Sequence, residues 1–219
     1  MSTTPNTPSP VAYPANLSVD YPDRKLNRLT SFFRIFTIIP IAIVIGLLVG
    51  SEHSGGGAHD TARWTLTIAG IGITFLPLVL MILFRQKYPR WWFDWNLNLT
   101  RFGYRVGAYF ALLRDEYPST DEEQSVHLDL QYPDVKTQLG RGWPLIKWFL
   151  LIPHYFVIFF LSIAAWVCII IAWFAILFTG RYPRGLFDFV VAVGRYGLRM
   201  EAYALILITD RYPPFSLER

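Results

Sequence analysis

The chain has 219 residues, of which 53% are hydrophobic and only 16% are charged, whereas soluble domains carry about 25% charged residues. This balance disfavours a soluble globular protein and favours a mainly α-helical integral membrane protein. Lys and Arg outnumber Asp and Glu by 20 to 16, but they are dispersed and no nucleic-acid-binding motif accompanies them. Anionic lipid headgroups are therefore the expected counter-charge, and nucleic acid is not an expected partner.

The first residues, 1–13, are rich in Pro, Ser and Thr. Such a composition predicts a disordered lead-in. The stretch has no basic segment followed by an apolar one, so we do not expect a secretory signal there.

From residue 14 onward the chain consists of two related halves. The sequences NLSVDYPD, FRIFTIIP, KYPRWWFDW and RFGYRVGAYFALLRDEYP in the first half are matched in the same order by HLDLQYPD, IKWFLLIP, RYPRGLFDF and RYGLRMEAYALILITDRYP in the second. We therefore predict a tandem duplication with pseudo-twofold symmetry. The first unit covers 14–118, an acidic linker covers 119–125, and the second unit covers 126–219.

Each unit opens with a short alternating segment. Apolar residues recur at every second position in both, at Leu17, Val19 and Tyr21 and again at Leu128, Leu130 and Tyr132. This period of two predicts one short strand per unit. The two strands are candidates for pairing with each other.

Long apolar stretches follow the strands. In the first unit, about 32–50 and about 64–84 are each long enough to cross a bilayer, and the Gly-rich sequence between them predicts a loop. In the second unit one unbroken apolar stretch covers about 145–178. A single helix of that length would reach about 50 Å, against about 30 Å of hydrocarbon. We therefore expect a helical hairpin that turns near 162–165, either crossing the bilayer or re-entrant.

Basic residues are nearly confined to one side of these stretches. Only Arg63 lies in the first connecting loop, and no Lys or Arg lies within 150–179. Because Lys and Arg accumulate in cytoplasmic loops, the pattern predicts a multi-pass protein with both termini in the cytoplasm. Each proline of the paired blocks, Pro40 and Pro153, is expected to kink the first span of its hairpin.

A polar stripe repeats on the last helix of each unit, predicted at about 91–114 and about 185–209. In both helices an acid, two arginines and a tyrosine are spaced by seven, four and four, which places them on one helical face. They are Asp94, Arg101, Arg105 and Tyr109, and Asp188, Arg195, Arg199 and Tyr203. Charges are costly at the centre of a membrane, so we predict interfacial amphipathic helices with their guanidinium groups towards water.

The stripe has several interpretations, of which a proton or ion pathway is one. The arginines could reach the headgroup layer while their stems stay in lipid, or they could pair with Asp94 and Asp188, most easily across the two units. Alternatively, Arg101, Arg105, Arg195 and Arg199, with Tyr109 and Tyr203, could bind lipid phosphate or another anion, because the planar guanidinium binds two oxygens. Aromatic residues at the Tyr-Pro turns and helix starts are expected as interfacial anchors: Trp91, Trp92, Trp95, Tyr182 and Tyr212.

Three features of the second unit resemble a known family. The sequence FTGRYPRGLFDF, the Arg-x3-Arg-x3-Tyr helix and the sequence TDRYPPFSL are together similar to a bacterial family of integral membrane proteins known only as domain of unknown function 4389. The resemblance is best over 141–217. The first unit departs from it, with KYPRWWFDW lacking the glycine and RDEYPST replacing TDRYPPF. The resemblance implies a bacterial inner-membrane location and no established activity.

Motifs for catalysis are missing from the sequence. It contains no phosphate-binding loop, dinucleotide fingerprint or nucleophile elbow, and its four histidines lack rigid metal-ligand spacing. We therefore expect no enzymatic activity, cofactor or metal. The leading hypothesis is an accessory or scaffold subunit of a larger membrane complex, or a bilayer-organising protein, with a protein partner or a second copy. The alternative is a lipid- or anion-handling transporter or channel component that uses the duplicated stripe.

Overall fold

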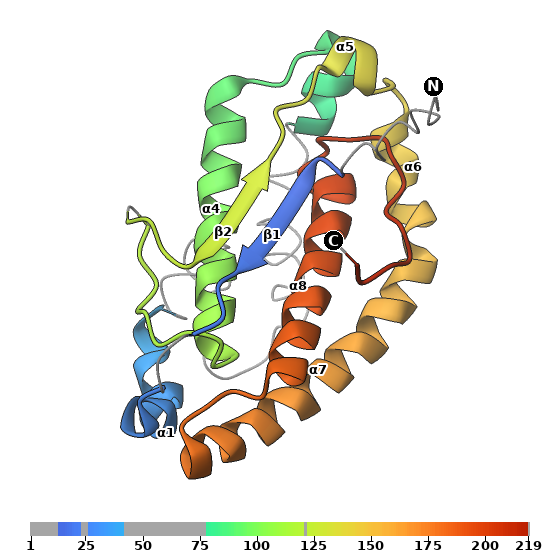
Figure 1. Cartoon of the computed structure of the whole chain (residues 1–219). Helices are drawn as coiled ribbons and strands as arrows, with labels where there is room; N and C mark the ends of the chain where they lie inside the picture. The colour runs from blue at the N-terminus through green and yellow to red at the C-terminus, as the bar shows by residue number, and fades with distance from the viewer. Residues whose placement is uncertain (1–12, 23–25, 42–77, 121, 219) are drawn as a thin grey trace, which may run out of the picture.

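The computed structural model describes residues 13–22, 26–41, 78–120 and 122–218 (Figure 1). The described part is mainly helical, as the composition predicts. In chain order its elements are β1 (Ala15–Val19), α1 (Arg28–Thr37), the π-helix η1 (Met81–Arg85), α4 (Arg90–Phe110), β2 (Val126–Leu130), α5 (Val135–Gln138), α6 (Trp143–Leu150), α7 (Ile152–Thr179) and α8 (Arg184–Ala204).

The two strands form a small antiparallel sheet in which Leu17 lies opposite Leu128. This confirms both the predicted strands and their pairing. A two-stranded sheet is only marginally stable by itself, and here β1 packs on α8 and β2 packs on α4 (Figure 1). The alternation noted in the sequence turns Leu17 and Leu128 towards these helices, where both are buried.

Helices α4 and α8 are the two predicted stripe-bearing helices. Each has 21 residues and starts directly after a Tyr-Pro pair, with Pro89 or Pro183 in extended conformation. Both end earlier than predicted, because the chain then passes through left-handed residues, Leu112 with φ 63° and Leu207 with φ 56°. A left-handed leucine is uncommon, and nothing in the local pattern reveals it.

Helix α7 corrects the prediction for the second unit. It runs without interruption for 28 residues, or about 42 Å at 1.5 Å per residue, so the hairpin turn near 162–165 is wrong. Ser162, at the expected turn, stays in the helix and donates its hydroxyl hydrogen to the carbonyl of Ile158, at 2.7 Å. Pro153 lies in the first turn, where no intrahelical bond is lost, so it begins the helix rather than kinking it. The helix ends at Gly180, with φ 74°.

Within the described part of the chain, α7 is the one helix that is long and apolar enough to cross a membrane. Only 11% of its most apolar 18-residue window is buried, although one side of α7 packs against α8. The predicted spans at about 32–50 and 64–84 fall largely on residues outside the described ranges.

Candidate functional site

In the second unit the stripe arginines lie beneath other parts of the chain. Arg195 and Arg199 are only 8% and 5% exposed. The Nε of Arg195 donates to the carbonyl of Leu17 in β1, at 3.1 Å, and Nη1 of Arg199 donates to the carbonyl of Ser216, at 2.9 Å. The expectation that these guanidinium groups face water is therefore wrong, because β1 and the C-terminal segment cover them.

The first unit repeats this arrangement with more exposed side chains. The Nε of Arg101 donates to the carbonyl of Leu128 in β2, at 2.8 Å, and its Nη2 lies 3.1 Å from the carboxylate of Asp129. Arg105 donates to the carbonyl of Ser119, at 2.7 Å. Each long helix thus uses an arginine to hold the strand of the other unit, and the stripe serves as an internal clamp.

The acids of the stripe take no part in this clamp. Asp94 and Asp188 are both exposed. The ion pairs among the residues that the structure describes include neither of them. The expected pairing of Asp94 and Asp188 with the stripe arginines is therefore not formed.

The stripe tyrosines mark two buried charge clusters that the sequence analysis missed. In the second unit Lys147 of α6 is fully buried. Its Nζ lies 2.8 Å from Oδ1 of Asp210, donates to the carbonyl of Thr209 at 2.6 Å, and lies 4.8 Å from the ring centroid of Tyr203. The other carboxylate oxygen accepts from the backbone N–H of Gly140, at 2.6 Å.

The first unit contains the same cluster. Arg34 of α1, 2% exposed, pairs with Asp115, and its guanidinium carbon lies 4.4 Å from the ring centroid of Tyr109. Its Nη1 donates to the carbonyl of Tyr109 at 3.0 Å, and Asp115 accepts from the backbone N–H of Asn27 at 2.8 Å. We call these the first-unit and second-unit charge clusters.

A sequence signal for these clusters existed. FRIFTIIP and IKWFLLIP each carry one cation, at the second position, and RDEYP and TDRYP each carry an aspartate two residues before Tyr. A lone cation in an apolar block requires a buried partner. The aspartates of RDEYP and TDRYP, which follow the two stripe helices in the matched sequences, are those partners.

The predicted anchors divide into two groups. Trp91 and Trp95 are 67% and 41% exposed, as an interfacial position requires, and Trp92 between them is partly buried. Tyr212 is partly exposed and its hydroxyl donates to the carbonyl of Leu150, at 3.0 Å. Tyr182 is buried instead, so it packs in the core and offers no surface to an interface.

A buried carboxyl group lies between the two stripe helices. Glu201 of α8 interacts with the hydroxyl of Tyr104 of α4, and its Oε2 is closed off from solvent without a hydrogen-bond partner. The pKa of Glu201 is raised to about 7, because burial disfavours the charged carboxylate. The hydrogen bond with Tyr104 acts in the opposite direction and lowers the pKa. In the matched sequences Glu201 corresponds to Gly107, so the first half has no acid at this position.

We expect Glu201→Gln to change how stability depends on pH. The pKa of this carboxyl group is 4.5 in the unfolded chain and about 7 in the folded one. Between these two pH values the folded state keeps a proton that the unfolded state releases, so folding stability falls as the pH rises. Gln does not ionise. The variant should melt several degrees higher than wild type at pH 8 and at nearly the same temperature at pH 4.5, by thermal unfolding in detergent. The matched control is Glu122→Gln at an exposed site, which should show no such difference.

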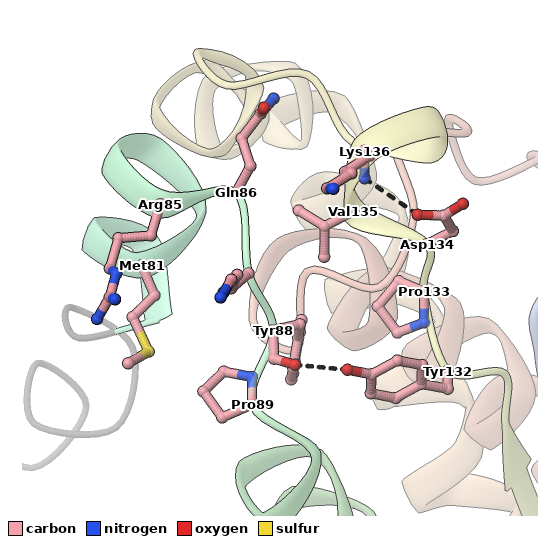
Figure 2. Close-up of a pocket in the computed structure, with 11 residues that line it drawn as sticks. Met81, Arg85, Gln86, Tyr88, Pro89, Tyr132, Pro133, Asp134, Val135 and Lys136 are labelled. Carbon is pink, nitrogen blue, oxygen red and sulfur yellow. Dashed lines mark hydrogen bonds between the residues drawn. The ribbon is translucent and has the colours of Figure 1, made fainter.

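A basic cleft of about 630 Å³ opens between the end of η1 and α5 (Figure 2). Tyr132 closes one side, its hydroxyl donating to the carbonyl of Tyr88. Three exposed cations line the cleft, Arg85, Lys87 and Lys136. Asp134 lines the same cleft, so the cations outnumber the acid by three to one and the cleft has a net positive charge.

Candidate metal ligands do not cluster in the part of the chain that the structure describes. Among the described residues, no group of three or more His, Cys, Asp or Glu side chains could hold a metal ion. The loop histidines His53 and His59 lie outside the described ranges.

Comparison with known proteins gives one match. No curated protein and no solved structure matches the chain. Residues 144–216 match the model of a protein family described as "Domain of unknown function (DUF4389)". This segment includes α7 and α8 with the second-unit charge cluster and the arginines of the second stripe. Residues 144–216, about a third of the chain, are thus similar to the DUF4389 family.

Proposed function

We propose that the chain is a non-enzymatic membrane protein that α7 anchors in the bilayer and that acts as an accessory or scaffold subunit of a larger membrane complex. The outer face of α7 carries this proposal. Large apolar side chains stand out from it, among them Phe156, Phe160 and Phe178, which are 65%, 65% and 78% exposed. A contiguous apolar surface of this kind marks contact with lipid or with another protein.

A membrane-spanning helix describes α7 better than a core helix of a soluble protein or a signal sequence does. A core helix of a soluble protein is mostly buried, whereas 11% of the most apolar window of α7 is buried. A signal sequence lies near the N-terminus, whereas α7 begins at Ile152. Insertion into lipid is therefore the better account of the exposed face.

We further propose that the two halves are tandem copies related by a pseudo-twofold axis. The strand register supports this, because Leu17 lies opposite Leu128, its own counterpart in the matched sequences. Crossed contacts support it as well. The hydroxyl of Tyr21 donates to the carbonyl of Tyr182, and that of Tyr132 donates to the carbonyl of Tyr88.

The wider topology belongs to the same proposal. A location in the bacterial inner membrane, with the stripe helices at the interface, agrees with the distribution of Lys and Arg. The expected multi-pass topology with both termini in the cytoplasm is not kept, because α7 is one continuous helix and would place its two ends on opposite sides of the membrane. In this arrangement α7 contributes the lipid-embedded part of the second unit as one helix.

The alternative, handling of anionic lipids or other anions, is favoured by the basic cleft. All four stripe arginines donate to backbone carbonyls. Of the four, only Arg101 and Arg105 are partly exposed, so only these two could still reach an anion. By contrast, Arg85, Lys87 and Lys136 line an open cleft (Figure 2). Phosphate oxygens are good acceptors for such cations.

Purification of the full chain in mild detergent, followed by mass spectrometry, tests both functions. A protein partner in fixed stoichiometry is the result expected for an accessory subunit. Anionic phospholipid that co-purifies with wild type and is reduced severalfold by Arg85→Gln with Lys87→Gln favours the alternative. The matched control is Arg181→Gln, since Arg181 occupies the position of Lys87 in the second unit. A lone, lipid-free monomer contradicts both.

A further inference from the structure

Residues 211–218 form a strap that follows α8 and lies back against it. From the end of α8 the chain runs towards α6 and returns to the side of α8 (Figure 1). The hydroxyl of Tyr212 donates to the carbonyl of Leu150 at the end of α6, at 3.0 Å. Phe215 stacks on the ring of His154 in α7, with 3.9 Å between the ring centroids. Tyr212 and Phe215 are themselves 37% and 59% exposed, so the strap lies on the surface of the molecule.

Beneath the strap lies a buried arginine that has no acidic partner among the described residues. Arg199 is 5% exposed, and its Nη1 and Nη2 donate to the carbonyls of Ser216 and Glu218 in the strap. Nη1 of the neighbouring Arg195 donates to the carbonyl of Leu217, at 3.4 Å. The ion pairs that the structure describes do not include Arg199. The terminal nitrogens of Arg199 are thus held by neutral oxygens of the strap, and displacement of the strap would free them.

The buried cations of the two charge clusters are neutralised, in contrast to Arg199. Arg34 pairs with Asp115, and Lys147 pairs with Asp210. A buried charge is costly unless it is paired, and burial lowers the pKa of Arg199. An anion at the position of the strap carbonyls would supply the missing charge. Its hydrogen bonds would be about twice as strong as those of neutral acceptors, and the planar guanidinium can bind two phosphate oxygens at once.

We propose that Arg199, together with Arg195, binds a phosphate group, and that the strap closes this site by placing its carbonyl oxygens where phosphate oxygens would bind. The group belongs to a phospholipid headgroup or to free phosphate, which share this chemistry. While the strap is closed the two arginines are out of reach, so binding competes with closure. The proposal extends the anion-handling alternative to a second site. It does not depend on the basic cleft, because no stripe arginine lines that cleft.

Phe215→Ala tests this competition, because it removes the stacking on His154 and so weakens the strap. The full chain is purified free of lipid in a neutral detergent. Inorganic phosphate is titrated by isothermal titration calorimetry, and phosphatidylglycerol is titrated by native mass spectrometry. The variant should bind at least one probe about fivefold or more tightly than wild type, because the apparent affinity of a site falls with the fraction of molecules in which it is open. The matched control Phe178→Ala, at an exposed phenylalanine outside the strap, should bind like wild type.

The contribution of Arg199 is tested in the Phe215→Ala background. Arg199→Gln should abolish the gain in affinity, whereas Arg85→Gln with Lys87→Gln should keep it, so failure of the cleft and failure of this site are distinguishable. If Arg199→Gln does not fold, Arg199→Lys, which keeps the charge but lacks the planar fork, should still weaken the gain.

The two probes distinguish the sources of the phosphate group. A gain with phosphatidylglycerol alone supports a lipid headgroup, and a gain with inorganic phosphate supports a free anion. Equal binding by wild type and Phe215→Ala is the result for a segment that only completes the fold, and it overturns the proposal. A gain that survives both substitutions of Arg199 overturns it as well.

Discussion

Asp210→Ala should lower the thermal unfolding midpoint by about 6–20 °C. The substitution leaves Lys147, a fully buried cation, without its carboxylate. Removal of one partner of a buried ion pair costs about 3–5 kcal/mol, and in a chain of this size each kcal/mol shifts the midpoint by about 2–4 °C. Asp115→Ala should act in the same direction, because Arg34 is 2% exposed. Thermal unfolding of the purified chain in mild detergent measures both effects.

The double variant Lys147→Met with Asp210→Ala shows whether the loss of stability comes from an unpaired buried charge or from general disruption of the packing. With both charges removed, no cation remains without a partner, and an apolar replacement for a buried pair is often tolerated. The double variant should therefore melt closer to wild type than Asp210→Ala does. Asp188→Ala, at an exposed aspartate with no ion pair among the described residues, should leave the midpoint unchanged. A double variant as unstable as the single one contradicts this account of the cluster.

Val167→Arg should release the protein from the membrane fraction. Val167 lies near the middle of α7 and is 51% exposed. An arginine at the centre of a spanning helix costs about 2.5–3.5 kcal/mol on insertion scales, which corresponds to a shift of roughly a hundredfold in the ratio of inserted to non-inserted chain. Alkaline carbonate extraction followed by immunoblotting of pellet and supernatant measures this ratio.

Trp91→Arg on α4 is the control for this charge insertion. Trp91 is also well exposed, at 67%, but it is assigned to the interface, where an arginine reaches the headgroups at little cost. The Trp91→Arg protein should remain in the pellet. If both variants resist extraction as well as wild type does, α7 is not the membrane anchor.

Local patterns in the sequence predicted the strands and the stripe helices. The alternation around Leu17 and Leu128 depends on neighbouring residues alone, and Pro89 and Pro183 fix where α4 and α8 begin. Hence the type and approximate position of these elements could be derived. The uninterrupted course of α7 was not predicted, because a turn was inferred by analogy with the Gly-rich loop of the first half. The second half has no glycine or proline between His154 and Thr179 that would form such a turn.

The candidate site was predicted less well because its contacts join distant parts of the chain. Spacing places Arg195 and Arg199 on one helical face, but it does not reveal that a strand 178 residues earlier in the chain covers Arg195. The same applies to Glu201, whose partner Tyr104 lies on the other long helix. In contrast, comparison of the repeats position by position would have paired Lys147 with Asp210, since both have charged counterparts in the first unit.

On the proposed tandem duplication, the crossed arginine contacts bear on how such a chain could have arisen. Arg195 holds β1 and Arg101 holds β2, so neither half clamps its own strand. A protein with only one half would have to exchange arms with an identical neighbour to make the same contacts. Such an ancestor would be an arm-exchanged homodimer, and joining its two copies into one polypeptide would remove the dependence of folding on subunit concentration.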